Sequence, residues 1–469
     1  MQSVPRLMIS AVRGGLGKTT LSLGIIAAWR RQGKQVAPFK KGPDYIDAGW
    51  LGAASGVPCY NLDLFLMDEA GIRRSFEVHT AGKDAAVIEG NRGLYDGVDA
   101  AGTYSTARLA RLLRSPVILI VDCTKASSTV AAVVLGCRTF DPSVTLGGVV
   151  LNNIASQRQE AVIRQAIEQH AGVPVVGAVP RLTHGEFPER HMGLTPFHEH
   201  PDVEKAIAAA VSAAERHLDL DALWRIASAA GETGPVAESL QGVRTQVNHG
   251  SERPVIGVIR DRAFQFYYPD NLEALEQQGA ALREINALED RELPEIDALY
   301  IGGGFPETQA AELAANRSFC ASVRHAVEQG LPVYAECGGL IYLGRTLRVG
   351  ERTYPMTGIL PADFVLENKP QGHGYTVVEV RTANPFFAVG TVLRGHEFHY
   401  SRVANTGELN SLCFTLQRGR GIDGRSDGIT HRNVLASYTH VHAAGVPQWA
   451  EGMVTAALTF RRNRMVGAR

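Results

Sequence analysis

The sequence predicts an α/β protein with two domains, each built around parallel strands. Short apolar runs alternate with amphipathic stretches in the N-terminal half, and the same alternation resumes after residue 253. This pattern is typical of parallel strands joined by crossover helices. Between about residues 229 and 253 it gives way to Gly, Ser, Glu, Gln and Pro without periodicity, which favours a linker. We therefore expect a first domain over residues 1–230, a linker over 231–253 and a second domain over 254–469.

Composition indicates a globular protein that binds neither nucleic acid nor a membrane. The 469 residues are too many for one ordinary core. Hydrophobic residues make up 45% and charged residues 20% of the chain, as in folded globular proteins. The formal net charge is -1, so no basic track for nucleic acid or an anionic surface is indicated. The apolar runs are too short to span a bilayer.

Cysteine usage and the N-terminus predict a cytoplasmic protein. The six cysteines form no Cys-x-x-Cys pair, so neither a zinc site nor a disulfide framework is indicated. This usage fits a reducing compartment. The N-terminus carries no basic and apolar leader, because residues 6–12 are explained as a strand that runs into a glycine-rich loop.

Six strands are expected in the first domain. Several are rich in Val and Ile without polar alternation, which is typical of strands buried on both faces. The first helix is expected over residues 19–31 and would end at Gly33. The predicted strands span residues 7–12, 36–39, 86–89, 117–122, 148–151 and 175–179.

A second alternating series begins after the linker. Helices are expected near residues 271–278 and over 309–329. After residue 354 the pattern indicates shorter strands, more turns and fewer helices. The predicted strands of the first part span residues 255–259, 281–285, 298–301 and 333–335.

The loop between the first strand and the first helix predicts a nucleotide site. Glycines allow successive backbone N–H groups to face a phosphate, a lysine reaches the outer phosphates, and a hydroxyl binds the metal. Val12 stands where the common motif has its first glycine, and Arg13 stands where a variant subgroup of P-loop ATPases has a second lysine. Asn152, at another strand end, would contact the base or belong to a plain turn. The predicted nucleotide-binding residues are Arg13, Gly14, Gly15, Gly17, Lys18, Thr19, Thr20 and Asn152.

Acidic residues at the predicted strand ends suggest a magnesium site. Asp44, Glu89 and Asp122 follow three different strands, and the carboxyl ends of parallel strands share one edge of a sheet. Each acid alone is equally well explained as a solvated loop residue. As a set they predict bound Mg²⁺ with ATP as co-substrate, the protein ligands being Thr19, Asp44 and Glu89.

A second site is predicted around Cys337, which follows a β-prone run and precedes two glycines. A nucleophile on such a turn would be exposed, and the positive end of the following helix would favour its thiolate. The glycines, and a second cluster at residues 302–304, would let backbone donors approach an oxyanion. His440 and His442 lie two residues apart in the segment that follows a strand-like run at residues 434–436, and we favour His440 as the base.

The cluster at residues 395–399 holds two histidines and one glutamate. A metal site is conceivable, but this spacing is weak support for one. We expect substrate or interdomain contact instead.

Together these segments resemble the cobyrinic acid a,c-diamide synthase family, over nearly the whole chain. The order and spacing of the segments make the resemblance specific. They are RGGLGKTT (13–20), PFKKGPDYID (38–47), NLD (61–63), EGNRGLYDG (89–97), ERHMGL (189–194), AFQFYY (263–268), GGGFPE (302–307), AECGGL (335–340) and ASYTHVH (436–442).

The resemblance implies a P-loop parallel-sheet ATPase domain followed by an α/β class I type glutamine amidotransferase domain. It implies a carbon–nitrogen ligase that uses ATP and L-glutamine to amidate the a and c acetate groups of a cobyrinate-type tetrapyrrole through an acyl phosphate. Cys337 would attack glutamine and His440 would activate it. The substrate-binding residues would be Asp44, Tyr45, Asp47, Arg92, Gly303, Gly304 and Gly338.

Departures from the family pattern leave the tetrapyrrole open. They are Arg13, Asn91-Arg92 and Gln265, and Arg92 would contact a substrate acid group. The same amidation on sirohaem or nickel sirohydrochlorin is an alternative. A partition-type ATPase switch is an alternative function of another class, but that function would not explain Cys337 and His440. The expected partners are small molecules, and the oligomeric state, a homodimer included, stays open.

Overall fold

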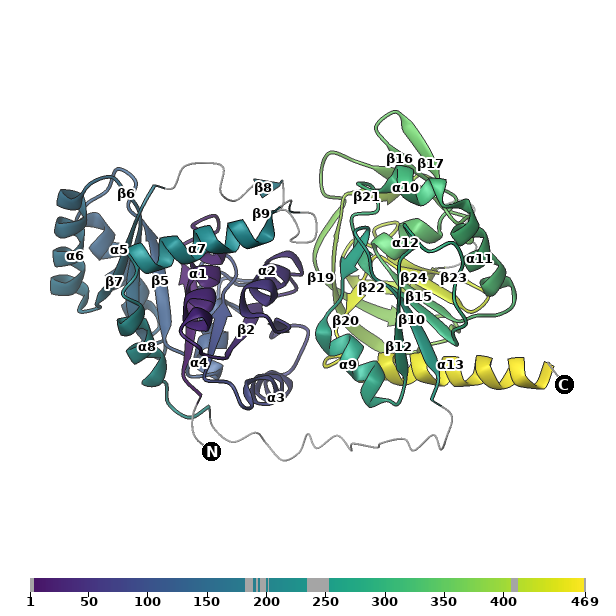
Figure 1. Cartoon of the computed structure of the whole chain (residues 1–469), viewed down its shortest axis with the longest axis horizontal. Helices are drawn as coiled ribbons and strands as arrows, with labels where there is room; N and C mark the ends of the chain where they lie inside the picture. The colour runs from purple at the N-terminus through teal and green to yellow at the C-terminus, as the bar shows by residue number, and fades with distance from the viewer. Residues whose placement is uncertain are drawn as a thin grey trace. The chain divides into compact units, whose positions relative to one another are not determined.

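The structure, a computed structural model, describes residues 4–181, 189–190, 193–194, 200, 202–233, 253–405 and 412–467. The chain divides into two compact units, Met1–Leu240 and Gln241–Arg469 (Figure 1). Residues 234–252 of the predicted linker lie outside the described residues. So do residues 191 and 192 of the ERHMGL segment, which stand between the strands β8 (Glu189–Arg190) and β9 (Gly193–Leu194).

A seven-stranded parallel sheet forms the centre of the first unit. Its strand order is β3-β2-β4-β1-β5-β6-β7. All six predicted strands are present, and β3 is an additional strand of 3 residues. The strands are β1 (Arg6–Ala11), β2 (Val36–Lys41), β3 (Tyr60–Leu62), β4 (Ala85–Glu89), β5 (Val117–Asp122), β6 (Leu146–Ile154) and β7 (Val175–Pro180).

Helices bury both faces of this sheet. Leu7 and Ile9 of β1 belong to a core shared with α1, α2, α7 and α8, whereas Met8 between them is fully buried on the opposite side. Burial on both faces explains why these strands lack polar alternation. The helices are α1 (Lys18–Arg31), α2 (Ile46–Ser55), α3 (Glu69–Thr80), α4 (Thr106–Leu112), α5 (Thr129–Phe140), α6 (Gln157–Ala171), α7 (Val203–His217) and α8 (Leu220–Ser228).

Helix α7 packs against α1, the helix that starts at the glycine-rich loop. The two helices approach closely because small residues meet between them. A Cβ atom on Gly24 would lie 2.5 Å from the carbonyl oxygen of Ala210 and 2.8 Å from the Cβ of Ala214. Only glycine fits at this position without a shift of the α7 backbone.

A ten-stranded mixed sheet forms the centre of the second unit, in the order β12-β10-β13-β15-β24-β23-β22-β19-β20-β25. The strands from β12 to β24 run parallel, and each later pair is antiparallel. The strands are β10 (Val255–Ile259), β12 (Ala281–Ile285), β13 (Ala298–Ile301), β15 (Val333–Glu336), β19 (Gly372–Val380), β20 (Val392–His399), β22 (Leu412–Arg418), β23 (Ser426–His431), β24 (Val434–Ser437) and β25 (His440–Val441).

Smaller sheets and the helices α9 to α13 complete the described part of the second unit. A two-stranded sheet pairs β11 (Phe264–Phe266) with β14 (Gly303–Gly304). A four-stranded sheet holds β16 (Thr346–Val349), β17 (Arg352–Pro355), β18 (Asp363–Leu366) and β21 (Ser401–Val403). The helices are α9 (Pro269–Gln277), α10 (Ala310–Ala315), α11 (Arg317–Glu328), α12 (Gly338–Leu343) and α13 (Pro447–Gly467).

The prediction of one helix over residues 309–329 is wrong, because the chain breaks at Asn316 into α10 and α11. The side chain of Asn316 accepts from the N–H of Phe319 at 3.4 Å and donates to two carbonyl groups outside the helix. Asparagine side chains compete in this way with the helical backbone, so they favour a helix start. Across the residues that the structure describes, no helix has the length and apolar character needed to cross a membrane.

The close contact of α1 and α7 predicts opposite effects for two Gly→Ala substitutions. Gly24→Ala should lower the free energy of unfolding of the first unit by about 1–3 kcal/mol, because the added methyl group overlaps the α7 backbone. Gly136→Ala in α5, where a Cβ would meet no atom within 4 Å, should raise it by about 0.5–1 kcal/mol. Calorimetric unfolding of the two variants measures both effects. Equal stabilisation by the two substitutions would contradict the packing described.

Candidate active site

The glycine-rich loop of the first unit joins the end of β1 to the start of α1. Gly15 and Gly17 adopt positive φ angles of 70° and 75°, and Gly17 is the residue that precedes the helix. Glycine adopts this backbone conformation without steric cost, and it turns successive N–H groups toward one side. The loop therefore offers an anion site at the positive end of α1.

Lys18 and Thr19 begin the helix and face the neighbouring strand ends. The Lys18 Nζ donates to the carbonyl oxygen of Arg92 at 2.9 Å, and the Thr19 hydroxyl donates to Glu89 Oε1 at 2.9 Å. Burial, followed by the nearby charge of Lys40, lowers the pKa of Lys18. Thr20 also lies in the first turn of α1.

A buried lysine that the sequence analysis missed occupies the centre of the acidic cluster. The Nζ of Lys40 lies 2.6 Å from Asp47 Oδ2, 2.6 Å from Glu89 Oε1 and 3.7 Å from Asp44 Oδ2. Burial alone would lower the pKa of Lys40, but the charges of Asp47 and Glu89 raise it well above its usual value. A signal was available in the sequence, since two lysines close a strand that is otherwise apolar.

The two aspartates of this cluster differ in their surroundings. Asp44 Oδ1 accepts from the backbone N–H of Asp47 at 2.9 Å at the start of α2. Burial and the charge of Asp47 raise the pKa of Asp44 to about 7. Burial opposes ionisation of Asp47 as well, but Lys40 outweighs it and lowers the pKa of Asp47. Tyr45, also predicted to bind substrate, is the residue before α2.

The donor set at this edge fits a magnesium ion that arrives with a nucleotide. Thr19 and Glu89 offer hard oxygen donors, and Glu89 Oε2 is buried without a hydrogen-bond partner. Magnesium is commonly held by one or two protein oxygens together with phosphate and water. Among the described residues, no three His, Cys, Asp or Glu side chains are arranged to hold a metal by themselves. Asp44 contacts Lys40, so its role as a metal ligand stays a prediction.

Of the remaining predicted nucleotide residues, Arg13 follows β1 and contacts the end of β5, whereas Asn152 lies near the end of β6. Arg13 pairs with Asp122 at 2.8 Å, and its side chain is 60% exposed. The Asn152 side chain donates to the carbonyl oxygen of Leu16 at 3.1 Å and so braces the loop. Partial burial opposes ionisation of Asp122, but hydrogen bonds led by that from Thr124 lower its pKa to about 2. Arg92 has a φ of 51° and an exposed side chain.

Cys337 of the second unit lies on a strained turn between β15 and α12. Its backbone angles are φ 47° and ψ -95°, and its N–H donates to the carbonyl oxygen of Ser437 at 2.8 Å. A non-glycine residue with positive φ is costly and is often found at nucleophile turns. The adjacent strand β24 therefore fixes the nucleophile's backbone.

The prediction that this turn exposes the sulfur is wrong for the described conformation. Cys337 is 6% exposed, and its Sγ lies 3.8 Å from the carbonyl oxygen of Phe398 on β20. Burial, followed by the charges of Glu307 and Glu336, raises the pKa of Cys337. These effects outweigh the six-residue helix α12, so the thiol is neutral at pH 7 and needs a base.

The glycines predicted near the thiol lie close to one another and to His440. A Cβ on Gly338 would lie 3.0 Å from the backbone nitrogen of Gly304, and one on Gly303 would lie 2.6 Å from Cε1 of His440. The turn after β13 and the start of α12 are therefore in direct contact. The role of Gly303, Gly304 and Gly338 as sources of backbone donors to an oxyanion stays a prediction.

The two candidate histidines have different partners. His440 Nδ1 lies 3.4 Å from Glu336 Oε2, and the ring stacks on His396 with centroids 4.8 Å apart. His442 Nε2 lies 3.4 Å from Asp270 Oδ2 instead. The geometry thus favours His440, the histidine beside Gly303. Glu336 was not predicted as a site residue, although it directly precedes the cysteine, and His396 was predicted only as part of the 395–399 cluster.

Glu397 and His399 of the 395–399 cluster form hydrogen bonds with other residues of the second unit. Glu397 accepts from the backbone N–H groups of Arg420 and Gly421 at 2.6 and 2.8 Å. His399 Nδ1 lies 2.7 Å from the carbonyl oxygen of Ser401. These bonds hold β20 beside Cys337. The metal alternative has no support in the described part of the chain.

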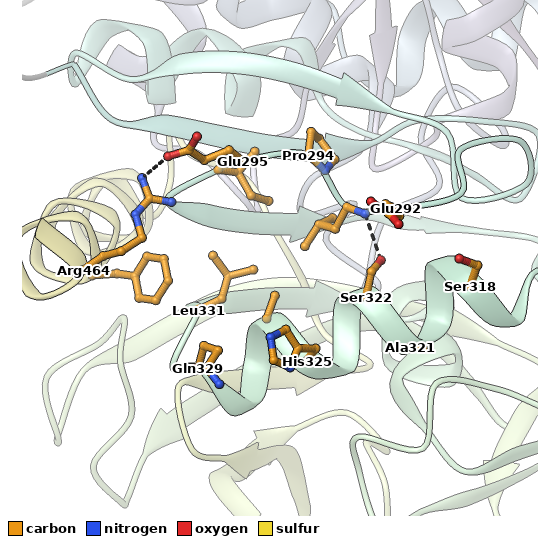
Figure 2. Close-up of a pocket in the computed structure, with 14 residues that line it drawn as sticks. Glu292, Pro294, Glu295, Ser318, Ala321, Ser322, His325, Gln329, Leu331 and Arg464 are labelled. Atoms are coloured by element: carbon orange, nitrogen blue, oxygen red, sulfur yellow. Dashed lines mark hydrogen bonds and ion pairs between the residues drawn. The ribbon is translucent and has the colours of Figure 1, made fainter. Parts of the chain in front are cut away.

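A separate surface pocket of about 680 Å³ lies between α11, α13 and the chain before β13. Figure 2 shows the ion pair of Arg464 with Glu295 and the bond from the Leu293 N–H to Ser322 along its wall. The pocket is lined by neither Cys337 nor His440, so it is distinct from the thiol site.

The fold and these two regions define a class of protein: a P-loop nucleotide-binding unit joined to a glutamine amidotransferase unit. Residues 7–194 match the CobQ/CobB/MinD/ParA nucleotide binding domain, and residues 255–447 match the CobB/CobQ-like glutamine amidotransferase domain. Cobyrinate a,c-diamide synthases are similar over nearly their whole length. That of Magnetococcus marinus is 42% identical over 95% of this chain and 96% of its own.

Two further synthases of that name extend the comparison. The one from Archaeoglobus fulgidus is 40% identical over 94% of both chains, and the one from Listeria monocytogenes serovar 1/2a is 39% identical over 93% of this chain and 96% of its own. The chain therefore belongs to the cobyrinate a,c-diamide synthase family, and it is an amidating ligase with a glutamine amidotransferase domain. The partition-type switch is accordingly set aside.

The buried position of Lys40 predicts how the first unit responds to its removal. Lys40→Met should lower the free energy of unfolding by about 3–5 kcal/mol, because it leaves carboxylates buried without a counter-charge. Adding Glu89→Gln should restore part of that loss, since it removes one of the unpaired charges. Urea unfolding of the two single variants and the double variant measures the coupling. Simple additivity of the two substitutions would count against the pairing.

Proposed function

We propose that this chain amidates the a and c acetate side chains of a cobyrinate-type tetrapyrrole, with ATP as the activating substrate and glutamine as the nitrogen source. One observation carries the proposal. A glycine-rich loop before a helix and a cysteine on a strained strand-to-helix turn occur in one chain, and a cobyrinate a,c-diamide synthase matches that chain nearly end to end. Each round would consume ATP, glutamine and water and release ADP, phosphate and glutamate.

The first unit would activate the acid. A carboxylate oxygen of the substrate attacks the γ-phosphorus of ATP, ADP departs, and an acyl phosphate forms, so that phosphate rather than oxide is the later leaving group. Lys18 would neutralise charge on the transferring group, and the backbone N–H groups of the glycine loop would hold the β-phosphate. Asp44, Tyr45 and Asp47 would border the acceptor carboxylate.

Magnesium fits this unit as a cofactor, held by Thr19 and Glu89 together with the nucleotide. When bound, it would supply positive charge beside the phosphates. Lys40 contacts the same carboxylate through Oε1 and leaves Oε2 without a hydrogen-bond partner. Lys40 therefore keeps Glu89 in place while leaving one of its oxygens for the ion.

The second unit would release ammonia. His440 takes the thiol proton as Cys337 attacks the glutamine amide carbon, and backbone donors near Gly303 and Gly338 stabilise the oxyanion. The protonated amide nitrogen leaves as ammonia, and water then hydrolyses the thioester to glutamate. Ammonia attacks the acyl phosphate in the first unit, and phosphate is expelled.

Arg92 is the residue on which the choice of ring would depend. Its carbonyl oxygen is fixed by Lys18, while its side chain is exposed beside the strand ends. A guanidinium group suits a bidentate contact with a carboxylate. Cobyrinate, sirohaem and nickel sirohydrochlorin all carry carboxylate side chains, so the same amidation on the latter two remains the second candidate.

The division of labour predicts the behaviour of Cys337→Ser. This variant should lose glutamine-dependent amidation by at least about 10³-fold, because the thioester cannot form. It should retain amidation with added ammonium chloride, since acid activation takes place in the other unit. Product masses with glutamine or ammonium as the nitrogen source measure both activities. Loss of both activities in a folded variant would contradict the proposal.

The substrate is tested by supplying each ring in turn. We expect hydrogenobyrinate or cobyrinate to gain two amides in the presence of ATP and glutamine, each lowering the product mass by the exchange of a hydroxyl for an amino group. Sirohaem and nickel sirohydrochlorin serve as comparison substrates, and product masses are the measurement. Amidation of sirohaem in preference to cobyrinate would replace the first candidate with the second.

A further inference from the structure

The carboxylate of Glu336 lies at the junction of the strand that carries the nucleophile and the strand that carries the base. Glu336 is the last residue of β15, directly before Cys337, and it is 1% exposed. Its Oε2 lies 3.4 Å from His440 Nδ1, and its Oε1 accepts from the N–H of Val441 at 3.1 Å. One carboxylate therefore contacts both the ring of His440 and the backbone of the next residue.

Other groups fix this carboxylate in place. The hydroxyl of Tyr300 donates to Oε2 at 3.1 Å. Burial, followed by the charge of Glu336, raises the pKa of Tyr300 well above its usual value, so this hydroxyl stays a donor. A buried carboxylate is stable only when its oxygens are paired in this way. The result is an acceptor of fixed position beside the imidazole.

We propose that Glu336 is the positioning residue of His440, which rests on the role of Cys337 and His440 in the proposed function. A carboxylate at Nδ1 keeps the proton on that nitrogen and leaves Nε2 as the nitrogen that accepts the thiol proton. The 3.4 Å separation is long for a hydrogen bond, but such contacts tighten when substrate binds. Glu336 acts through His440 and does not touch glutamine.

The other histidine and carboxylate pair has a different role. His442 Nδ1 accepts from the N–H of Ala444 at 3.2 Å, and its Nε2 faces Asp270. Both ring nitrogens are thus directed to the loop before α13 and to α9. His442 directly follows the short strand β25, and its ring contacts Ala444 and Asp270, so the Asp270 pair supports the loop before α13.

The proposal is tested by comparing Glu336→Gln with Asp270→Asn as the matched control. Glutamine hydrolysis is followed as glutamate release, and ammonia-dependent amidation reports whether the enzyme is folded. We expect Glu336→Gln to lower kcat for glutamine by about 10²-fold or more, with little change in KM and in the ammonia-dependent rate. Asp270→Asn should keep the glutamine kcat, and Glu336→Asp should recover part of it.

Alkylation of Cys337 by iodoacetamide separates orientation from a general disturbance of the pocket. Burial is the main cause of the raised pKa of the Cys337 thiol, and the charges of Glu307 and Glu336 raise it further. Glu336→Gln removes one of these charges, so this variant should alkylate faster than the unaltered enzyme at the same pH while it hydrolyses glutamine more slowly. A merely structural role would not produce this opposite pair of changes.

Three outcomes would overturn the assignment. In the first, the glutamine kcat of Glu336→Gln stays within about threefold of the unaltered enzyme. In the second, Glu336→Gln loses the ammonia-dependent rate as well as the glutamine kcat. In the third, Asp270→Asn loses more of the glutamine kcat than Glu336→Gln does. The test also separates the two levels of inference. If the unaltered enzyme releases no glutamate from glutamine, the proposed function fails; if it does and Glu336→Gln is equally active, only the role of Glu336 fails.

Discussion

Both sites depend on one constraint, which is that parallel strands bring their carboxyl ends to the same edge of a sheet. In the first unit this edge gathers Lys18, Lys40 and Glu89 from three elements far apart in sequence. In the second unit it brings the turn at Cys337 against the end of β24, where the N–H of Cys337 bonds Ser437. His440 follows Ser437 by three residues along the chain. The loops of the two sites differ in sequence, but in both units the sheet determines where the loop residues lie.

A second constraint is that each site encloses charge that is stable only when it is paired. Lys40 is buried against three carboxylates, and Glu336 is buried against Tyr300, Val441 and His440. Interactions of this kind are stronger away from water and need no reorganisation during reaction. They also explain why removal of a single partner, rather than of the whole group, is the damaging change. The same burial keeps Cys337 neutral and makes a nearby base necessary.

Family membership and local chemistry contribute different parts of the account. The relatives establish an amidating ligase whose two domains match over most of the chain. The local geometry adds which atoms meet: His440 rather than His442 lies beside Gly303, and Lys40 lies where only acidic residues and a metal had been expected. In our proposal Arg92 and its neighbours determine which ring binds, since the sequence departs from the family pattern there.

The sequence alone determined the α/β class, six strands of the first sheet, four parallel strands of the second, the glycine-rich loop and the turn at Cys337. These features are local: glycines in a fixed spacing, unbroken apolar runs and a helix start are set by neighbouring residues. Only the tertiary structure decided that Lys40 joins three carboxylates, that Glu336 faces His440 and that Cys337 is buried under β20. Such contacts join residues up to 104 positions apart, as between Glu336 and His440, and neither burial nor pairing across strands can be derived from local pattern because both depend on how the sheets assemble.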